Sequence, residues 1–324
     1  MTTFKEIRGT AVESVSSDPS NPEEGQIWYN NSIGVLKGYK NLGDVWASGG
    51  NMSTARNSLA GCGTQTAGLA FGGYSPSSAT EEYNGSTWTA GGNLGTARGY
   101  FAGCGIQTAG LGIGGYTATT ATSNLTEEYD GSTWTGGGNL ATGRNTVGAA
   151  GTQTAAFAAG GSIGFPTNTA VTEEYNGTSW TGGGNLAQAR QQPAGAGTQT
   201  VGLVFGGLDA GVLLANTEEY DGSAWTAGGN MNTARRTLAG AGTQTVGLGF
   251  GGLIAAVSAA TEEYNGTSWT NTTSMTTARR NLGGAGTQTS ALGFGGYTTA
   301  ATTATEEYTG GPNLAVQTIT TSTS

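Results

Sequence analysis

Adjacent glutamates are the residues of this chain whose type and spacing suggest acid–base chemistry. Two carboxylates that flank one glycosidic bond can serve as general acid and as nucleophile or base. An active site is singular, however, and this pair occurs in six copies, so we interpret the pairs as structural. The pairs are Glu81-Glu82, Glu127-Glu128, Glu173-Glu174, Glu218-Glu219, Glu262-Glu263 and Glu306-Glu307.

The sequence contains no histidine. That removes the commonest general base, the imidazole metal ligand and the Ser-His and Cys-His nucleophile pairs. We therefore predict a protein that is not an enzyme, with no cofactor and no metal site. The two cysteines, Cys62 and Cys104, stand where four other copies of the repeat have alanine, which indicates small buried side chains. A disulfide between them depends on a backbone distance that the sequence does not give.

The glutamate pairs belong to a repeat with a period of 42 to 46 residues. Each copy has an arginine, a glutamine nine residues later, a Gly-Gly pair seven residues further on, and then Thr-Glu-Glu-Tyr. A fixed period of this length is typical of stacked supersecondary units, as in solenoids and propellers. The arginines are Arg56, Arg98, Arg144, Arg190, Arg235 and Arg279, and the glutamines are Gln65, Gln107, Gln153, Gln199, Gln244 and Gln288.

Each copy predicts four short antiparallel strands. In the first copy they are residues 56–63, 67–72 and 80–83 and a strand around Trp88, which follows an Asn84-Gly85 hairpin turn. The first strand is rich in Gly and Ala, as expected of the innermost strand near a crowded axis. Helix signals are absent, so we predict an all-β propeller of four-stranded blades.

The tryptophans predict how the ring closes. The sixth copy, which ends in residues 305–314, lacks the tryptophan strand that the other five contain, and an equivalent strand surrounds Trp46 near the start of the chain. We therefore predict six blades, with the Trp46 strand completing the blade of residues 279–308. The alternative is a seventh blade made from residues 27–29, 35–37 and 45–46 with the C-terminal tail. The tryptophans are Trp46, Trp88, Trp134, Trp180, Trp225 and Trp269.

Gly-Gly at the end of the second strand, Tyr in the third and Trp in the fourth resemble the Kelch repeat over residues 46–314. This resemblance implies a β-propeller that serves as a binding scaffold. Some Kelch propellers are copper oxidases similar to galactose oxidase, but these need His and Tyr ligands, and this sequence has no His.

The first forty residues resemble the N-terminal segment of tailed-phage virion proteins, especially fibre-like proteins of marine phages and cyanophages. The match lies in Gly25 to Asn30 (GQIWYN) and Val35 to Tyr39. The resemblance implies a virion-anchoring segment at 1–25 and a β-hairpin module at 26–45, before the propeller at 46–314 and a Thr/Ser-rich tail at 315–324. Within the anchor we single out Phe4, Ile7 and Arg8.

Charge and hydropathy exclude some partners and locations. The net charge of −9 and pI near 4.5 argue against nucleic acid or an anionic membrane as the main partner. No apolar stretch is long enough to span a bilayer, and the first residues lack a signal-peptide core. Combined with the resemblance to tailed-phage virion proteins, these features lead us to expect a protein made in the host cytoplasm and carried on the surface of the virion.

The topology of a blade places the repeated arginine and the glutamate pair near one face. We predict an Arg–Glu ladder around the ring there, and a ring of glutamine amides at the opposite channel mouth. The glutamines either cap turn backbone groups or share an axial ligand or ion.

The segments between Gly-Gly and Thr-Glu-Glu-Tyr vary from six to ten residues and share no sequence, as recognition loops on a fixed frame do. We call them the variable loops: 74–79, 116–125, 162–171, 208–216, 253–260 and 297–304. Their apolar residues suggest either burial against a partner or packing on their own blade. The candidate binding residues are Tyr74, Tyr116, Phe165, Asp209, Leu213, Leu214, Ile254 and Tyr297.

The two resemblances, together with the variable loops, imply a tail- or fibre-associated phage protein displayed for adhesion to a host or surface. It would join other virion proteins through its N-terminal segment, form a homo-oligomer, and contact a host receptor or glycan through the variable loops. The alternatives are a purely architectural capsid-decoration or neck protein and a glycan-binding, lectin-like propeller.

Overall fold

A computed structural model describes residues 12–20, 25–41, 43–311 and 314–319. The chain divides into two compact units. One consists of residues 46–309, and the other combines residues 1–45 with residues 310–324. The described residues contain strands and no helix, which confirms the all-β prediction.

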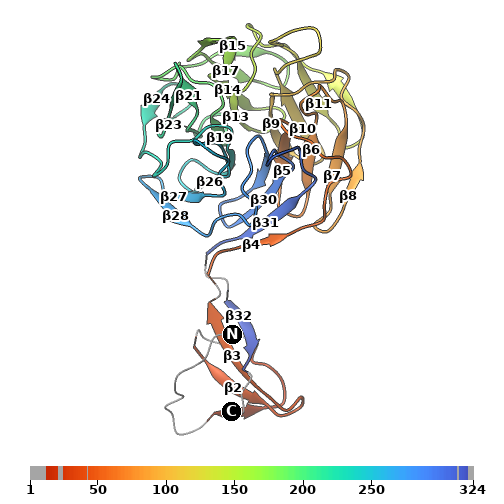
Figure 1. Ribbon diagram of the computed structural model, residues 1–324, viewed down its shortest axis with the longest axis vertical. Helices are drawn as coiled ribbons and strands as arrows, with labels where there is room; N and C mark the ends of the chain where they lie inside the picture. The colour runs from red at the N-terminus through yellow and green to blue at the C-terminus, as the bar shows by residue number, and fades with distance from the viewer. Residues whose placement is uncertain (1–11, 21–24, 42, 312–313, 320–324) are drawn as a thin grey trace. The chain divides into compact units, whose positions relative to one another are not determined.

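Repeated four-stranded antiparallel sheets build the unit of residues 46–309. Its described residues form six of them, which we number in chain order (Figure 1). The first three sheets are β5 (Ala60–Gly63), β6 (Gly68–Phe71), β7 (Thr80–Tyr83) and β8 (Trp88–Ala90); β9 (Ala102–Ile106), β10 (Ala109–Ile113), β11 (Thr126–Tyr129) and β12 (Trp134–Gly136); and β13 (Gly148–Gly151), β14 (Ala156–Ala159), β17 (Thr172–Tyr175) and β18 (Trp180–Gly182). The other three are β19 (Ala194–Gly197), β20 (Gly202–Phe205), β23 (Thr217–Tyr220) and β24 (Trp225–Ala227); β25 (Ala239–Gly242), β26 (Gly247–Phe250), β27 (Thr261–Tyr264) and β28 (Trp269–Thr272); and β29 (Gly283–Gly286), β30 (Ser290–Phe294), β31 (Thr305–Thr309) and β4 (Val45–Ser48).

The size of the side chains matches the position of each strand. The Gly- and Ala-rich strands β5, β9, β13 and β19 lie nearest the axis in Figure 1, where neighbouring inner strands contact one another. Aromatic residues fill the space between sheets further out, as where Phe71 packs against Trp134 of the next sheet with ring centroids 4.7 Å apart. Sheets with small inner strands and bulky outer residues fit a β-propeller.

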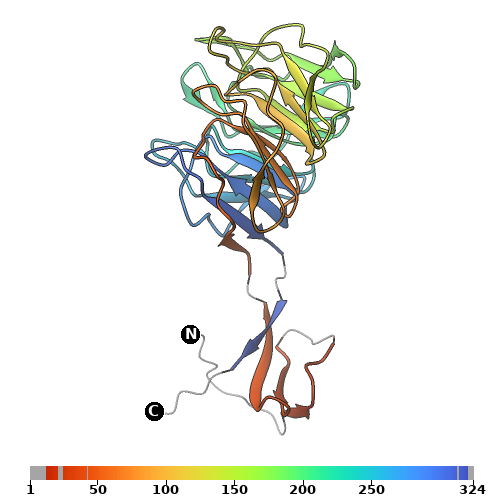
Figure 2. The same cartoon turned by 90° about the vertical axis from the view of Figure 1, so that its right-hand side faces the viewer.

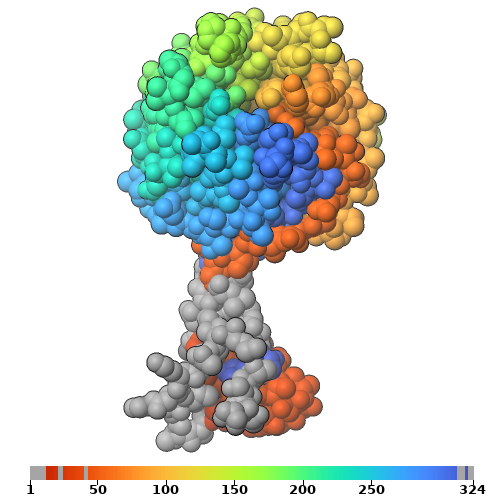
Figure 3. All heavy atoms as spheres, viewed as in Figure 1, coloured from red at the N-terminus to blue at the C-terminus, as the bar shows by residue number. Residues whose placement is uncertain are grey.

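The sixth sheet takes its outer strand from the start of the chain. The order β29-β30-β31-β4 places Trp46 in the position that Trp88 or Trp134 has in its own sheet. The inner strands β29 and β5 are in contact, and Figure 3 shows the blue C-terminal part of this unit directly beside the orange atoms of its first sheets. Trp46 is therefore not part of a seventh sheet.

Two variable loops have secondary structure of their own. Residues 162–168 form a hairpin of β15 (Ser162–Gly164) and β16 (Thr167–Asn168), and residues 208–213 form one of β21 (Leu208–Asp209) and β22 (Val212–Leu213). Asn168 donates to the Leu208 carbonyl oxygen at 3.2 Å and to Asp209 at 3.1 Å, so the two hairpins are joined.

The second unit contains a four-stranded sheet of its own. Its order is β1 (Glu13–Val15), β2 (Ile27–Asn30), β3 (Val35–Asn41) and β32 (Leu314–Thr318), and Figures 1 and 2 show blue β32 beside red-orange β3. Residues 27–29 and 35–37 thus lie in one sheet with the C-terminal strand β32, as the seven-blade alternative proposed. Trp46, however, is not in that sheet. Residues 315–318 belong to β32 and are not a free tail. The anchor residues Phe4, Ile7 and Arg8 lie outside the described residues.

Candidate functional site

The six repeated arginines fix the bases of the variable loops. Arg56 donates from Nη1 to the carbonyl oxygens of Gly72 and Ala79, at 3.0 and 2.7 Å, and these residues lie at the two ends of the loop 74–79. Its Nη2 donates to Glu81 at 2.7 Å. The other five arginines repeat this arrangement, with Arg–Glu distances between 2.5 and 3.0 Å, and all six side chains are buried. Hydrogen bonds from one buried arginine therefore fix both ends of each variable loop.

The first glutamate of each pair completes this clamp. Glu81 accepts a hydrogen bond from Arg56 on one oxygen and from the backbone N–H of Ser53 on the other, the second at 2.6 Å. Burial lowers the pKa of Arg56, and the charge of Glu81 acts in the opposite direction. A buried ion pair that also satisfies backbone groups is structural.

The predicted Arg–Glu pairs are present in all six copies, and each ion pair joins two residues of the same repeat. Neighbouring sheets are joined instead through the second glutamate, as where Tyr129 of the second sheet donates to Glu82 of the first at 2.6 Å. The indole N–H of Trp134 likewise donates to Thr80 at 3.0 Å.

The repeated glutamines also join sheets. The amide nitrogen of Gln107 donates to the carbonyl oxygens of Gly68 and Tyr83 in the preceding sheet, at 3.1 and 2.7 Å. All six glutamines repeat this contact with their own preceding sheet. They cap backbone groups, as one of the two sequence interpretations held, but those of the neighbouring sheet and not of their own turn.

The Tyr–Glu links predict sensitivity to alkaline pH. Burial, followed by the hydrogen bond to the glutamate, raises the pKa of Tyr129 to about 12, and four equivalent tyrosines have the same value. A raised folded-state pKa means stability that is complete below the ordinary value of 10 and lost as pH rises through about 12. We expect the free energy of unfolding to fall across this window. Denaturant titrations at several pH values measure it, and Tyr129→Phe, which cannot ionise, should reduce the pH dependence; an unchanged slope would contradict the link.

A ring of strained backbone surrounds the axis on the face of the variable loops. Six non-glycine residues, two after each repeated arginine, have left-handed φ values between 53° and 59°. Each donates its N–H to the carbonyl oxygen of the equivalent residue in the preceding sheet, and the six N···O distances lie between 2.7 and 3.0 Å. They are Ser58, Tyr100, Thr146, Gln192, Thr237 and Asn281. Left-handed φ is unfavourable for β-branched residues such as Thr146, so the ring of hydrogen bonds imposes it.

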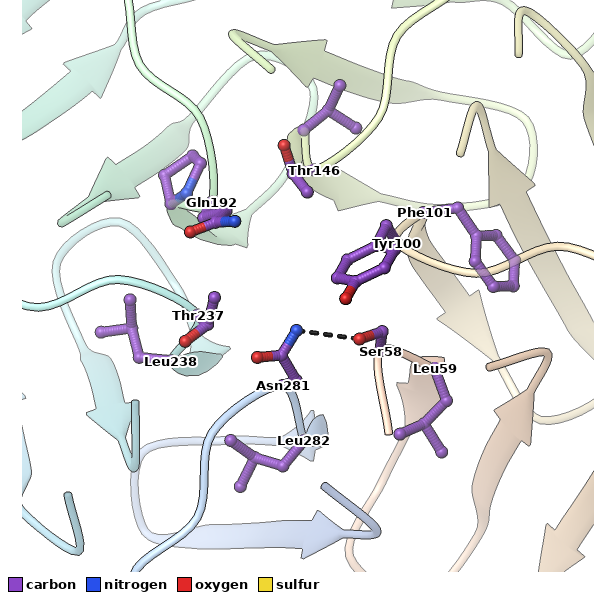
Figure 4. A pocket seen from close by; sticks show the side chains of 12 residues that line it. Ser58, Leu59, Tyr100, Phe101, Thr146, Gln192, Thr237, Leu238, Asn281 and Leu282 are labelled. Carbon is purple, nitrogen blue, oxygen red and sulfur yellow. Dashed lines mark hydrogen bonds between the residues drawn. The ribbon is translucent and has the colours of Figure 1, made fainter. Parts of the chain in front are cut away.

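This ring lines a narrow axial pocket of about 90 Å³. In Figure 4 the side chains of Tyr100, Gln192, Thr237 and Asn281 stand around it, and Asn281 donates to Ser58 at 2.8 Å.

A wider pocket of about 280 Å³ shares several residues with the first and extends to the variable loops. It brings together Tyr74, Tyr100 and Tyr297 with Arg236 and Arg280. Sequence analysis missed both arginines because each directly follows a repeated arginine. The signal was present, since the other four copies have Asn57, Gly99, Asn145 and Gln191 at this position.

The predicted binding residues fall into four groups. Tyr74 and Tyr297 line the wider pocket, whereas Phe165, Asp209 and Leu213 lie in the two hairpins. Phe165 is 90% exposed, but Asp209 is bound by Asn168 and Gln188. Leu214 is buried and packs on its own unit, while Tyr116 and Ile254 lie in other variable loops.

Cys62 and Cys104 are buried free thiols, and burial raises the pKa of Cys104 to about 12. Within residues 12–20, 25–41, 43–311 and 314–319, no cluster of three or more His, Cys, Asp or Glu residues could hold a metal ion. The same residues include no helix suited to crossing a membrane.

No family model matches this chain, and a search of curated proteins finds no relative.

Proposed function

We propose that the six sheets of residues 46–309 are blades of a closed, Kelch-like propeller, with the Trp46 strand completing the last blade. The ring of backbone hydrogen bonds supports closure, because Ser58 donates to Asn281 across the ends of the repeat. The tryptophan links support it too. Trp88 of the first sheet donates to Thr305 of the sixth at 2.9 Å, and Trp46 donates to Thr261 of the fifth at 3.1 Å.

We further propose that the protein is a non-enzymatic component of a tailed-phage virion, displayed for adhesion to the host or a surface. The observation that carries this proposal is the set of six variable loops, each held at its base by a buried Arg–Glu pair. Such a frame lets loop sequences change without disturbing the blades, as a recognition surface requires. The phage context rests on the resemblance of residues 1–40.

Deleting residues 1–25 tests the anchor. The unit of residues 46–309 lies outside this segment, so its thermal unfolding should be unchanged. We expect the shortened protein to be missing from purified particles, whereas the full-length protein is incorporated. Incorporation of both at equal levels would remove the anchor from the proposal.

Exposed apolar side chains favour architecture as a second candidate function. Phe165 at the tip of the β15–β16 hairpin is 90% exposed and Val212 is 64% exposed, which suits contact with another subunit. Replacing residues 208–216 and 253–260 by Gly/Ser segments separates the two functions. Loss of oligomerisation supports assembly, and loss of cell binding with an unchanged oligomer supports adhesion.

A further inference from the structure

The wider pocket on the axis concentrates positive charge that the repeat does not need. Among the described residues of 46–309, the six repeated arginines each pair with a glutamate, whereas Arg236 and Arg280 have no carboxylate partner. Both line the same pocket, in a protein with a net charge of −9. A cationic pocket on an otherwise acidic protein favours an anionic ligand at this place.

Both guanidinium groups are held in place by neighbours that leave donors free. Arg236 donates from Nη1 to the side-chain oxygen of Gln192 at 3.2 Å. The guanidinium carbon of Arg280 lies 4.9 Å from the ring centroid of Tyr297, a cation–π contact that orients the planar group without using its N–H donors. An oriented guanidinium binds a carboxylate through two parallel hydrogen bonds.

The remaining lining is suited to a sugar ring. Tyr74 and Tyr100 meet edge to face with centroids 5.5 Å apart, and Tyr74 is 55% exposed, so aromatic surface is available to the C–H face of a pyranose. Gln192 and Asn281 add amide groups that both donate to and accept from hydroxyls. A volume of about 280 Å³ lies at the lower end of ligand sites, which suits one sugar unit better than a peptide of several residues.

We infer that the wider pocket binds a carboxylate-bearing saccharide unit, such as a uronic acid, with Arg236 and Arg280 holding the carboxylate and Tyr74 and Tyr100 packing on the ring. The source of this ligand, a glycan on a surface, rests on the proposed adhesive function. Binding of the saccharide by the pocket can be measured with the purified protein alone.

The test compares glucuronate with glucose, acetate and sulfate as probes of the full-length protein, by NMR titration at low salt. Glucuronate should bind at least about 10-fold more tightly than each of the other three probes, because only glucuronate supplies both the charge and the ring. If acetate or sulfate binds as tightly as glucuronate, the sugar ring does not contribute and the proposed saccharide ligand is overturned. If glucose binds as tightly, the proposed role of the arginines is overturned. Tighter binding of a glutamate-rich peptide overturns the ligand class.

The variants use residues that the repeat already accepts at this position. Arg236→Gln and Arg280→Asn copy Gln191 and Asn57, so the double variant should unfold like the wild type. We expect its affinity for glucuronate to fall on the order of 10- to 100-fold. Val246→Ala, at an exposed residue outside the pocket and outside the variable loops, is the control and should bind as the wild type does. An unchanged affinity in the double variant overturns the inference.

Failure of this inference is distinguishable from failure of the proposed function. A double variant that loses glucuronate yet still joins particles supports both proposals. A protein that is absent from particles but binds glucuronate through Arg236 and Arg280 contradicts the virion role alone.

Discussion

Replacing Arg279 by methionine should lower the free energy of unfolding by about 3–5 kcal/mol, because it leaves a buried carboxylate without its cation. Arg279 is fully buried and donates to Glu306 at 2.9 Å. It also donates to the carbonyl oxygens of Gly295 and Ala304, at 3.0 and 2.6 Å, so three acceptors each lose one hydrogen bond together. Denaturant unfolding followed by tryptophan fluorescence measures the loss.

The neighbouring residue provides a matched control. Arg280 has the same charge but is only half-buried and has no carboxylate partner among the described residues, so Arg280→Met should cost less than about 1 kcal/mol. Adding Glu306→Gln to Arg279→Met removes the unpaired buried charge and should restore part of the stability. Equal losses for Arg279→Met and Arg280→Met would contradict the clamp.

Replacing Trp46 by alanine should also cost about 3–5 kcal/mol, although this residue lies far from its contacts in the sequence. Its indole ring packs against Phe250 and Tyr308, with both centroid distances 5.1 Å, and its N–H donates to Thr261 at 3.1 Å. Truncation leaves a cavity between the fifth and sixth sheets and an unpaired threonine hydroxyl.

Trp134 is the appropriate comparison for Trp46. Both side chains are 8% exposed, and Trp134 makes the equivalent contacts with Phe71, Tyr129 and Thr80 from within a continuous repeat. If the strand at residues 45–48 is an integral part of its sheet, the two substitutions should cost the same within about 1 kcal/mol. A loss for Trp46→Ala well below that for Trp134→Ala would show that β4 is a loosely attached edge.

The repeat made much of the fold predictable. The missing tryptophan in the sixth copy was sufficient to place Trp46 beside β31, and the Gly- and Ala-rich first strand was sufficient to place it at the axis. The first inference depends on the number of tryptophans and the second on the size of side chains, and both can be read directly from a repeated sequence.

The contacts between sheets were not predictable in the same way. Spacing indicates which residues share a sheet, but it does not indicate which residues of the neighbouring sheet form hydrogen bonds with Glu82 and Gln107. The left-handed φ of Thr146 runs against the preference of its residue type. The two small hairpins depend on pairing within loops that share no sequence.

The same physical limit explains the missed site. Arg236 and Arg280 occupy equivalent positions one repeat apart, and the arrangement of the sheets in space brings them to one pocket. Each of them directly follows an arginine, Arg235 or Arg279, that has an equivalent in every copy. The repeated arginine therefore drew attention away from the additional one.

Residues 46–309 are joined to the rest of the chain at both of their ends, since the second unit contains residues from both termini. Within that unit β3 and β32 are hydrogen-bonded neighbours, and within the first β4 and β31 are neighbours too. A protease that cuts one of the two connections divides the chain into two fragments, which stay associated through the hydrogen bonds between β3 and β32. Release of residues 46–309 from the second unit would then require a further cleavage or the loss of the pairing between β3 and β32.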